Sequence, residues 1–181
     1  AQVEMVFDKT SWLRDQGQHG GGTRYGCDHP QFFNRSSINV SQVHYDDDPE
    51  KKLSSATAIS SIIHPHSPHM PSIHVHISWT EMRDGHGYWR MMADLNPSLD
   101  CDWSSEFLES IQQVSGEHHA HGVEQGDHYF FIPALNRHRG VAHFYLENFH
   151  RDDFESDLDY ARSFGKSVIG TYTQKFESIT T

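Results

Sequence analysis

The chain has 181 residues and a formal net charge of −11 at pH 7, with its 16 histidines counted as neutral. A chain of this length is expected to form one domain, 1–181, with a sizeable hydrophobic core. The 14 lysines and arginines form no basic stripe, which argues against nucleic acid as a partner, and no apolar run approaches the roughly 20 residues of a membrane span.

The N-terminal third reads as strands joined by turns. Alternating apolar residues predict an initial strand over 1–7, and the glycine-rich segment 16–26 predicts a flexible loop. Further strands are expected at 37–45 and 56–63, because both are rich in β-branched residues. The acidic segment between them, 46–52, is expected to be a solvated turn.

The segment 73–79, IHVHISW, alternates in the manner of a half-buried strand. This alternation places His74, His76 and Ser78 on one face of the strand. Asp84 and Gly85 predict a hairpin, with a return strand at 88–92. Asp94 follows in an ADLNP sequence that we interpret as a turn, which could bring a carboxylate close to the two histidines.

The C-terminal part mixes helices and strands. Helical spacing of apolar residues predicts helices at 102–114 and 152–169, whereas 116–127 reads as a polar linker. Strands are expected at 129–133 and 140–146. The pattern as a whole predicts an α+β fold, with an antiparallel sheet flanked by helices on both faces.

Histidines and a carboxylate in this order suggest a metal centre. His74 and His76 would lie about 7 Å apart along one strand face, and with Asp94 they would form a 2-His-1-carboxylate set that suits non-heme iron. His143 or His44 could extend it. Zinc or copper would also accept these ligands. The alternative is that the histidines are scattered, solvated surface residues, because a His-x-His pair alone is a weak signal.

Three blocks of the sequence resemble oxygen-dependent coproporphyrinogen-III oxidases. The segment 60–97, SSIIHPHSPHMPSIHVH…YWRMMADLNP, resembles that family's SSVIHPxNPHxPTxHxNxRYFE…WWFGGGxDLTP. FNRSSINVSQVH at 33–44 resembles FEKAGVNxSVVHG, and YFFIPALNRHRGVAHFYLEN at 129–148 resembles YFFIPHRGExRGxGGIFFDD. The blocks stand in the family's order and span most of the chain.

The resemblance implies an enzyme of heme biosynthesis that uses dioxygen to decarboxylate two propionate side chains of a tetrapyrrole. It further implies a homodimer, an antiparallel sheet between helical layers, and no required metal or organic cofactor. The positions that match the family's site are the catalytic candidates Asp94, His74 and Arg139 and the substrate-binding candidates Asn39, Ser41 and Ser60.

The sequence also departs from the family pattern. Ser78 stands where the family has an arginine, so one expected clamp for a propionate is missing, and the residues 90–92 (RMM) replace a run of three glycines. The family's RGRYxEFNLxYDRGTKFGL segment does not occur. Two alternatives therefore stay open. One is a metal-dependent oxidase or oxygenase using Fe, Cu or Zn at His74, His76, Asp94 and His143, and the other is a non-catalytic tetrapyrrole-binding protein.

The sequence is compatible with more than one cellular compartment. The resemblance implies a cytoplasmic or mitochondrial protein. Ala1 in place of methionine predicts a cleaved or trimmed chain, and Cys27 and Cys101 are either two free thiols or one disulfide. A secreted protein with that bridge is therefore an alternative.

Overall fold

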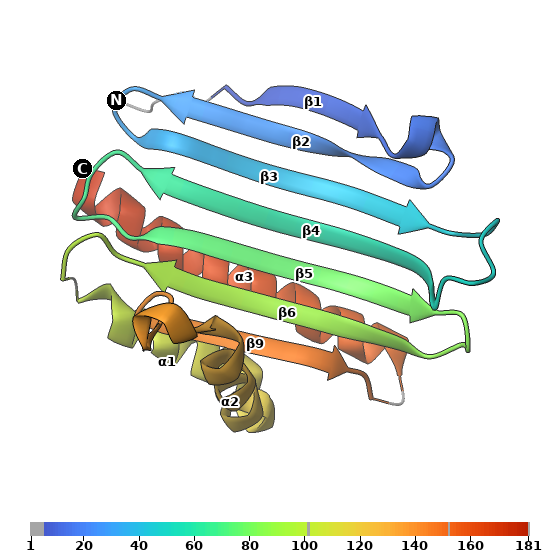
Figure 1. Ribbon diagram of the computed structural model, residues 1–181. Helices are drawn as coiled ribbons and strands as arrows, with labels where there is room; N and C mark the ends of the chain where they lie inside the picture. Colours follow the sequence, from blue (N-terminus) through green and yellow to red (C-terminus); the bar gives the residue numbers. More distant parts are fainter. Residues whose placement is uncertain (1–5, 101, 152, 181) are drawn as a thin grey trace.

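A seven-stranded antiparallel sheet organises the structure, a computed structural model that describes residues 6–100, 102–151 and 153–180 (Figure 1). The strand order is β1-β2-β3-β4-β5-β6-β9, so consecutive strands pair with one another up to β6. The strands are β1 (Asp8–Leu13), β2 (Gly20–His29), β3 (Phe33–His44), β4 (Leu53–Pro65), β5 (Ser72–Met82), β6 (Gly87–Asn96) and β9 (Ala142–Phe149).

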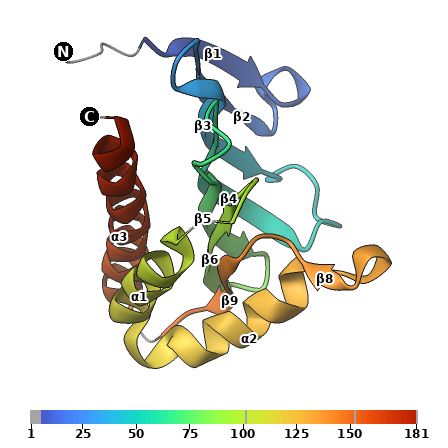
Figure 2. The same cartoon turned by 90° about the vertical axis from the view of Figure 1, so that its left-hand side faces the viewer.

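The helices lie mainly on one side of this sheet. They are α1 (Trp103–Ser115), α2 (His119–Phe130) and α3 (Phe154–Thr180), with short 3-10 turns η1 (Asp15–Gly17), η2 (Gly116–His118) and η3 (Pro133–Leu135). The strands β7 (Phe131–Ile132) and β8 (Arg137–His138) form a small separate hairpin. α1 and α3 share one face, whereas α2 packs against β9 at the edge of the sheet (Figure 2). The expected α+β class with an antiparallel sheet is confirmed, but the described helices lie on one face and at one edge of the sheet and not on both faces.

The hydrophobic core fills the space between the sheet and the helices α1 and α3. Alternate residues of β5, β6 and β9 point into it, and α3 contributes residues at steps of three and four, as the sequence predicts. The fully buried members are Ile73, Met91, Ala93, Leu95, Phe144, Leu146, Ile111, Ala161, Phe164 and Val168. The opposite face of the sheet has no helix over β2–β5 among the described residues (Figure 2), and we call this whole face, from β1 to β9, the open face.

The segment 16–26 is mostly strand, and the prediction of a flexible loop is wrong. A side chain at Gly21 would stand 2.3 Å from the Trp12 carbonyl oxygen, and one at Gly22 would stand 2.7 Å from the Trp12 ring. These glycines therefore let β1 and β2 approach closely. Most of the strand expected at 1–7 lies outside the described residues, which begin at residue 6, and β1 begins at Asp8.

The segment 116–127 is helical, which corrects the prediction of a polar linker. Its contact with the sheet is made through glycines: a Cβ at Gly122 would stand 2.1 Å from the Phe144 ring, and one at Gly126 would stand 2.9 Å from His143. A contact face of glycines leaves no apolar periodicity to read. The strand expected at 129–133 is correspondingly reduced to Phe131–Ile132, because α2 continues to Phe130.

Asp94 lies inside strand β6, which corrects its placement in a turn. The return strand expected at 88–92 runs on to Asn96, and Pro97 follows directly after it. An aspartate inside a buried strand is uncommon, and here hydrogen bonds described below compensate for it. Cys27 is a buried free thiol, whereas Cys101, the other half of the possible disulfide, lies outside the described residues.

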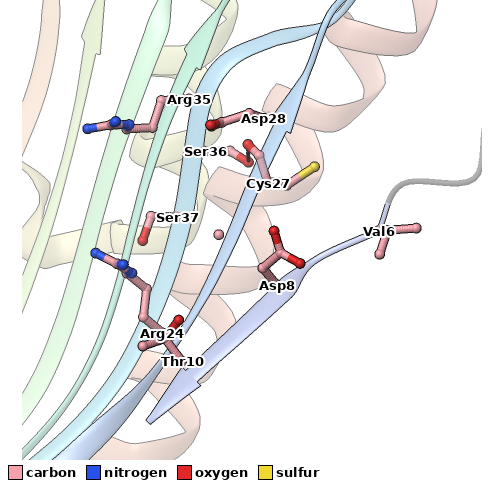
Figure 3. A pocket seen from close by; sticks show the side chains of 10 residues that line it. Val6, Asp8, Thr10, Arg24, Cys27, Asp28, Arg35, Ser36 and Ser37 are labelled. Carbon is pink, nitrogen blue, oxygen red and sulfur yellow. Dashed lines mark hydrogen bonds between the residues drawn. The ribbon is translucent and has the colours of Figure 1, made fainter. Parts of the chain in front are cut away.

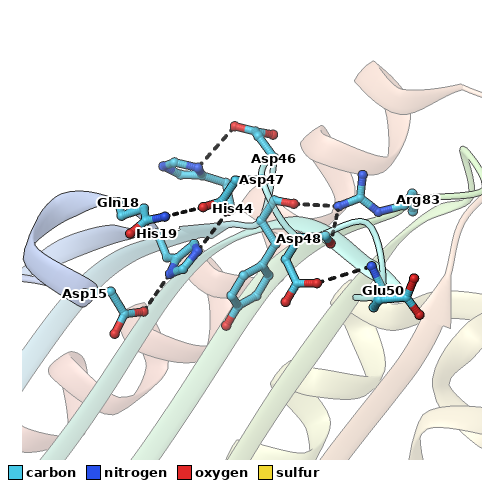
Figure 4. Close-up of polar contacts among 10 residues, drawn as sticks. Asp15, Gln18, His19, His44, Asp46, Asp47, Asp48, Glu50 and Arg83 are labelled. Atoms are coloured by element: carbon cyan, nitrogen blue, oxygen red, sulfur yellow. Dashed lines mark hydrogen bonds and ion pairs between the residues drawn. The ribbon is translucent and has the colours of Figure 1, made fainter.

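At one end of the sheet the acidic turn at 46–52 is tied to the neighbouring loops (Figure 4). The His19 ring stands between two carboxylates, with Nδ1 2.7 Å from Asp15 and Nε2 3.0 Å from Asp47. Arg83 donates hydrogen bonds to the carbonyl oxygens of Tyr45 and Asp48. No described helix is both long and apolar enough to cross a membrane.

Candidate active site

The register of the sheet gathers the candidate residues on the open face. His74 pairs with Asp94 across β5 and β6, and Asp94 pairs with His143 on β9. His76 pairs with Ser60, and Ser60 pairs with Asn39. Because cross-strand partners share a face, these residues form two neighbouring rows, and Ser41 lies two positions beyond Asn39 on the same face. The structure thus brings together every strand residue among the candidates.

Asp94 is the centre of this arrangement. Its side chain is 0% exposed. Arg139 donates from Nε to Oδ2 at 2.9 Å and from Nη2 to Oδ1 at 3.0 Å. Asn96 also donates to Oδ2, and His74 Nδ1 lies 3.3 Å from Oδ1. A carboxylate has about four acceptor positions, so the neighbours of Asp94 occupy all of them.

These contacts keep Asp94 ionised. Burial raises the pKa of the carboxyl, but the hydrogen bonds from His74, Asn96 and Arg139 outweigh it and hold the pKa below the ordinary value of 3.8. Asp94 is therefore a buried anion at neutral pH. Its charge is balanced chiefly by the bidentate guanidinium of Arg139.

Arg139 reaches Asp94 from the connection between β8 and β9. Its backbone N–H donates to the Phe130 carbonyl oxygen at 2.8 Å, and its guanidinium lies 4.7 Å from the centre of the Phe130 ring. Gly140 follows with φ +72°, and a Cβ there would stand 2.5 Å from the Leu95 carbonyl oxygen. The glycine thus lets the chain pass β6 closely. The Arg139 side chain is 41% exposed, so the arginine is accessible from solvent although its partner is not.

The histidines surround the Asp94–Arg139 pair without converging on one point. His64 packs edge-on against His74 with ring centroids 5.6 Å apart and bonds Ser72 through Nδ1. Burial lowers the pKa of His76, with a further contribution from Arg90. The His143 Nε2 atom lies 2.7 Å from Asp127, on the exposed side of α2. His74 and His143 are thus each next to a different carboxylate, that of Asp94 and that of Asp127.

The predicted metal ligands can be compared with the positions of the described side chains. Among the residues that the structure describes, no group of three or more His, Cys, Asp or Glu side chains is arranged to hold a metal ion. Asp94 already has its acceptor positions filled, and His143 faces Asp127. Iron, copper or zinc at His74, His76, Asp94 and His143 stays a prediction for elemental analysis.

Arg90 is a candidate that the sequence did not single out. It pairs with Ser78 across β5 and β6 and so projects from the open face. Its guanidinium forms an ion pair with Glu147, which also accepts a hydrogen bond from the Tyr145 hydroxyl at 2.7 Å. A two-residue turn at Asp84–Gly85 would have placed Ser78 opposite Met91, and the observed register differs from that by one residue. Arg90 therefore presents a cation on the strand next to Ser78.

The fold and this site define a class: an α+β protein with a candidate small-molecule site on the uncovered face of an antiparallel sheet, centred on a buried carboxylate and an arginine. Residues 1–180 match the family described as coproporphyrinogen III oxidase, and the chain belongs to that family.

Curated relatives agree with the family. Oxygen-dependent coproporphyrinogen-III oxidases from the AS9601 and MIT 9301 strains of Prochlorococcus marinus are each 27% identical to the chain over 152 residues. The oxidase of Prochlorococcus marinus subsp. pastoris shows the same identity. Each match covers 75% of this chain and 43% of the relative, so the chain spans less than half the length of these curated relatives.

Proposed function

We propose that the protein is an oxygen-dependent oxidase that removes carbon dioxide from propionate side chains of a coproporphyrinogen-like tetrapyrrole. Family membership supports this proposal. The observation that carries it is the Asp94–Arg139 pair beside His74 on the open face, because it offers an anion and a cation side by side to a substrate that has both N–H donors and carboxylates.

The chemistry of the step fits these groups. A propionate side chain loses carbon dioxide and two hydrogens to become a vinyl group, and dioxygen takes up the two hydrogens as hydrogen peroxide. Electron loss places positive charge on the pyrrole ring, and a fixed anion near that ring stabilises it. Asp94 is such an anion, held ionised by its neighbours. His74, next to it, is placed to accept or donate a proton at the reacting side chain.

Substrate binding requires an exchange of partners at Arg139. The acceptor positions of Asp94 are filled and the carboxylate is 0% exposed, so pyrrole N–H groups cannot reach it while Arg139 stays in place. A propionate carboxylate offers Arg139 an equivalent bidentate partner. When Arg139 turns to the propionate, Asp94 is uncovered for the pyrrole N–H groups, and every charge keeps a partner throughout the exchange.

Arg90 supplies a second cation for the same substrate. Its place opposite Ser78 puts a guanidinium on the open face one strand away from the position that the sequence comparison had left without one. Glu147 holds this guanidinium in the resting structure, as Asp94 holds Arg139. Two propionates could therefore be received by two arginines, each of which releases a carboxylate of the protein.

The proposal is tested by incubating the purified protein with coproporphyrinogen III in air, in the absence of dioxygen, and in air with a chelator. The expected result is stepwise loss of carbon dioxide from the substrate, which mass spectrometry detects. This reaction should require dioxygen and should continue in the presence of the chelator. Product formation without dioxygen, or none under any condition, would contradict it. The homodimer stays a prediction that sedimentation of the same sample tests.

A further inference from the structure

A polar pocket that contains two arginines lies on the open face at the β1–β3 end of the sheet. A pocket of about 410 Å³ opens there, lined by Asp8, Thr10, Arg24, Gly26, Arg35 and Ser37, among others (Figure 3). It is separate from the Asp94 site and shares no residue with it. Its lining is mostly polar, in a protein whose net charge is −11.

The two arginines of this pocket are available to a ligand. In Figure 3, Arg24 and Arg35 project from the sheet on the same side, with Ser37 between them. Neither guanidinium has an ion pair or a hydrogen bond within the described chain, although Asp8 and Asp28 also line the pocket. Gly26, opposite Ser37, keeps the floor open, because a Cβ there would meet only the Ser36 carbonyl oxygen, at 3.9 Å.

The spacing of the two arginines favours a ligand with several carboxylates. Arg24 pairs with Asn39, which lies four residues from Arg35 along β3. The two Cα atoms are therefore separated by about 13 Å along the strand direction. A broad molecule with carboxylates at separate points of its edge can engage both guanidiniums from such anchor points.

The pocket is aligned with the candidate active site. One row of cross-strand pairs runs from Arg24 through Asn39 and Ser60 to His76, and the next runs from Ser37 through Ile62 and His74 to Asp94. Ser37 is three strands from Asp94, or about 14 Å. A flat substrate lying over these rows would extend its far edge toward the arginines.

We propose that Arg24 and Arg35 bind peripheral carboxylates of the substrate that lies over Asp94, on the side of the molecule remote from the carboxylate held by Arg139. This assignment rests on the proposed function. Arginine suits the role, because its planar fork binds carboxylates bidentately. The two residues are specificity determinants: they favour a tetracarboxylate over a similar ring with fewer carboxylates.

The test is a fluorescence titration of the protein with coproporphyrin III, the oxidised and non-reacting tetracarboxylate. Arg24→Gln and Arg35→Gln are each expected to weaken binding about tenfold, which corresponds to one charge-assisted hydrogen-bonded contact. Arg24→Lys and Arg35→Lys keep the charge and should restore part of the loss. Arg162→Gln, which removes a cation paired with Asp159 on α3, is the matched control and should bind like the wild type.

The outcomes separate the two proposals. Wild-type affinity in both glutamine variants, with the wild type binding coproporphyrin, overturns the pocket assignment and leaves the proposed function standing. An equal loss in Arg162→Gln also overturns it, because the effect would then be one of net charge. Absence of binding by the wild type overturns the proposed function together with the ligand assigned to the pocket. Melting temperatures of all variants show whether the fold is intact.

Discussion

The Arg139 guanidinium and the Asp94 carboxylate form a bidentate pair in which only the arginine reaches solvent. The two N–O distances are 2.9 and 3.0 Å, and the side chains are 41% and 0% exposed. The pair links strand β6 to the connection before β9. Its inner member cannot be solvated if the outer one leaves, unless a ligand enters at the same time.

Removing Arg139 should therefore destabilise the resting protein. We expect Arg139→Gln to lower the free energy of unfolding by about 2 kcal/mol, less than for a fully buried pair because the arginine is partly exposed. The double variant Arg139→Gln/Asp94→Asn should recover part of this loss, because no buried charge is left unpaired. Denaturant titration measures both, and a double variant no more stable than Arg139→Gln would contradict the explanation.

The Asp94–Arg139 pair also predicts how the stability of the protein changes with pH in the acidic range. The folded pKa of Asp94 is below its ordinary value of 3.8, so its contribution is present above that value and is lost as the pH falls through the folded pKa. Arg139→Gln should shrink the difference in stability between neutral and acidic solution.

Ser78 and Arg90 are cross-strand partners on β5 and β6. We expect substrate binding to need a cation on this part of the open face, and either strand can carry it. Arg90→Gly should raise the KM for coproporphyrinogen about tenfold, the effect of losing one charge-assisted contact. The exchange variant Ser78→Arg/Arg90→Gly should recover most of the affinity, because the guanidinium returns to the neighbouring strand. Steady-state kinetics measure both, and unchanged kinetics in Arg90→Gly would remove this residue from the site.

The strands and their faces could be predicted because alternation of the sequence reports burial directly. The prediction that His74, His76 and Ser78 share one face of β5 agrees with the register, in which their partners on β6 are Asp94, Met92 and Arg90. Asp94 was misplaced because its compensation comes from Arg139, 45 residues away, and no local pattern reveals such a partner. Its pairing with His74 needed the register of β5 and β6.

Glycine explains the other errors. Gly22 in β2 and Gly122 in α2 lie where another backbone or ring approaches closely, and glycine is also the residue of flexible loops. The sequence cannot distinguish these two uses, because the difference lies in what packs against the missing side chain. The segments 16–26 and 116–127 were both misread for this reason.

The effect of the close packing at Gly122 on stability can be compared with that of a helical glycine that has no close neighbour. Gly122→Ala should destabilise the protein by about 1–3 kcal/mol, because the new methyl overlaps the Phe144 ring. Gly170→Ala, on α3, meets nothing within 4 Å and should stabilise it by about 0.5–1 kcal/mol through helix propensity. Chemical denaturation compares the two, and a stabilising Gly122→Ala would mean that α2 does not pack against β9 in this way.

The contacts of His19 at the loop end of the sheet predict that its contribution to stability depends on pH. Both ring nitrogens face carboxylates, those of Asp15 and Asp47, and the Tyr45 ring lies 5.0 Å away. The hydrogen bond to Asp15 is the main cause that raises the pKa of His19 above 6.5. A raised folded pKa gives stability that is fully present below 6.5 and is lost as the pH rises through the folded value.

The melting temperatures of the wild type and His19→Gln should therefore differ more at about pH 5.5 than at about pH 8. His86→Gln, on the β5–β6 hairpin, is the control for the loss of one histidine. An equal difference at both values would show that His19 is not held as an imidazolium.

The most direct test of the central claim is the turnover of coproporphyrinogen III by Asp94→Asn, compared with the wild type and with Asp159→Asn, an exposed aspartate of α3. If Asp94 stabilises charge on the pyrrole ring, kcat should fall at least about 100-fold in Asp94→Asn, a loss typical of removing one preorganised electrostatic partner. Asp159→Asn should react like the wild type. Wild-type turnover in a folded Asp94→Asn protein would contradict the account, because the chemistry would then not depend on the carboxylate at its centre.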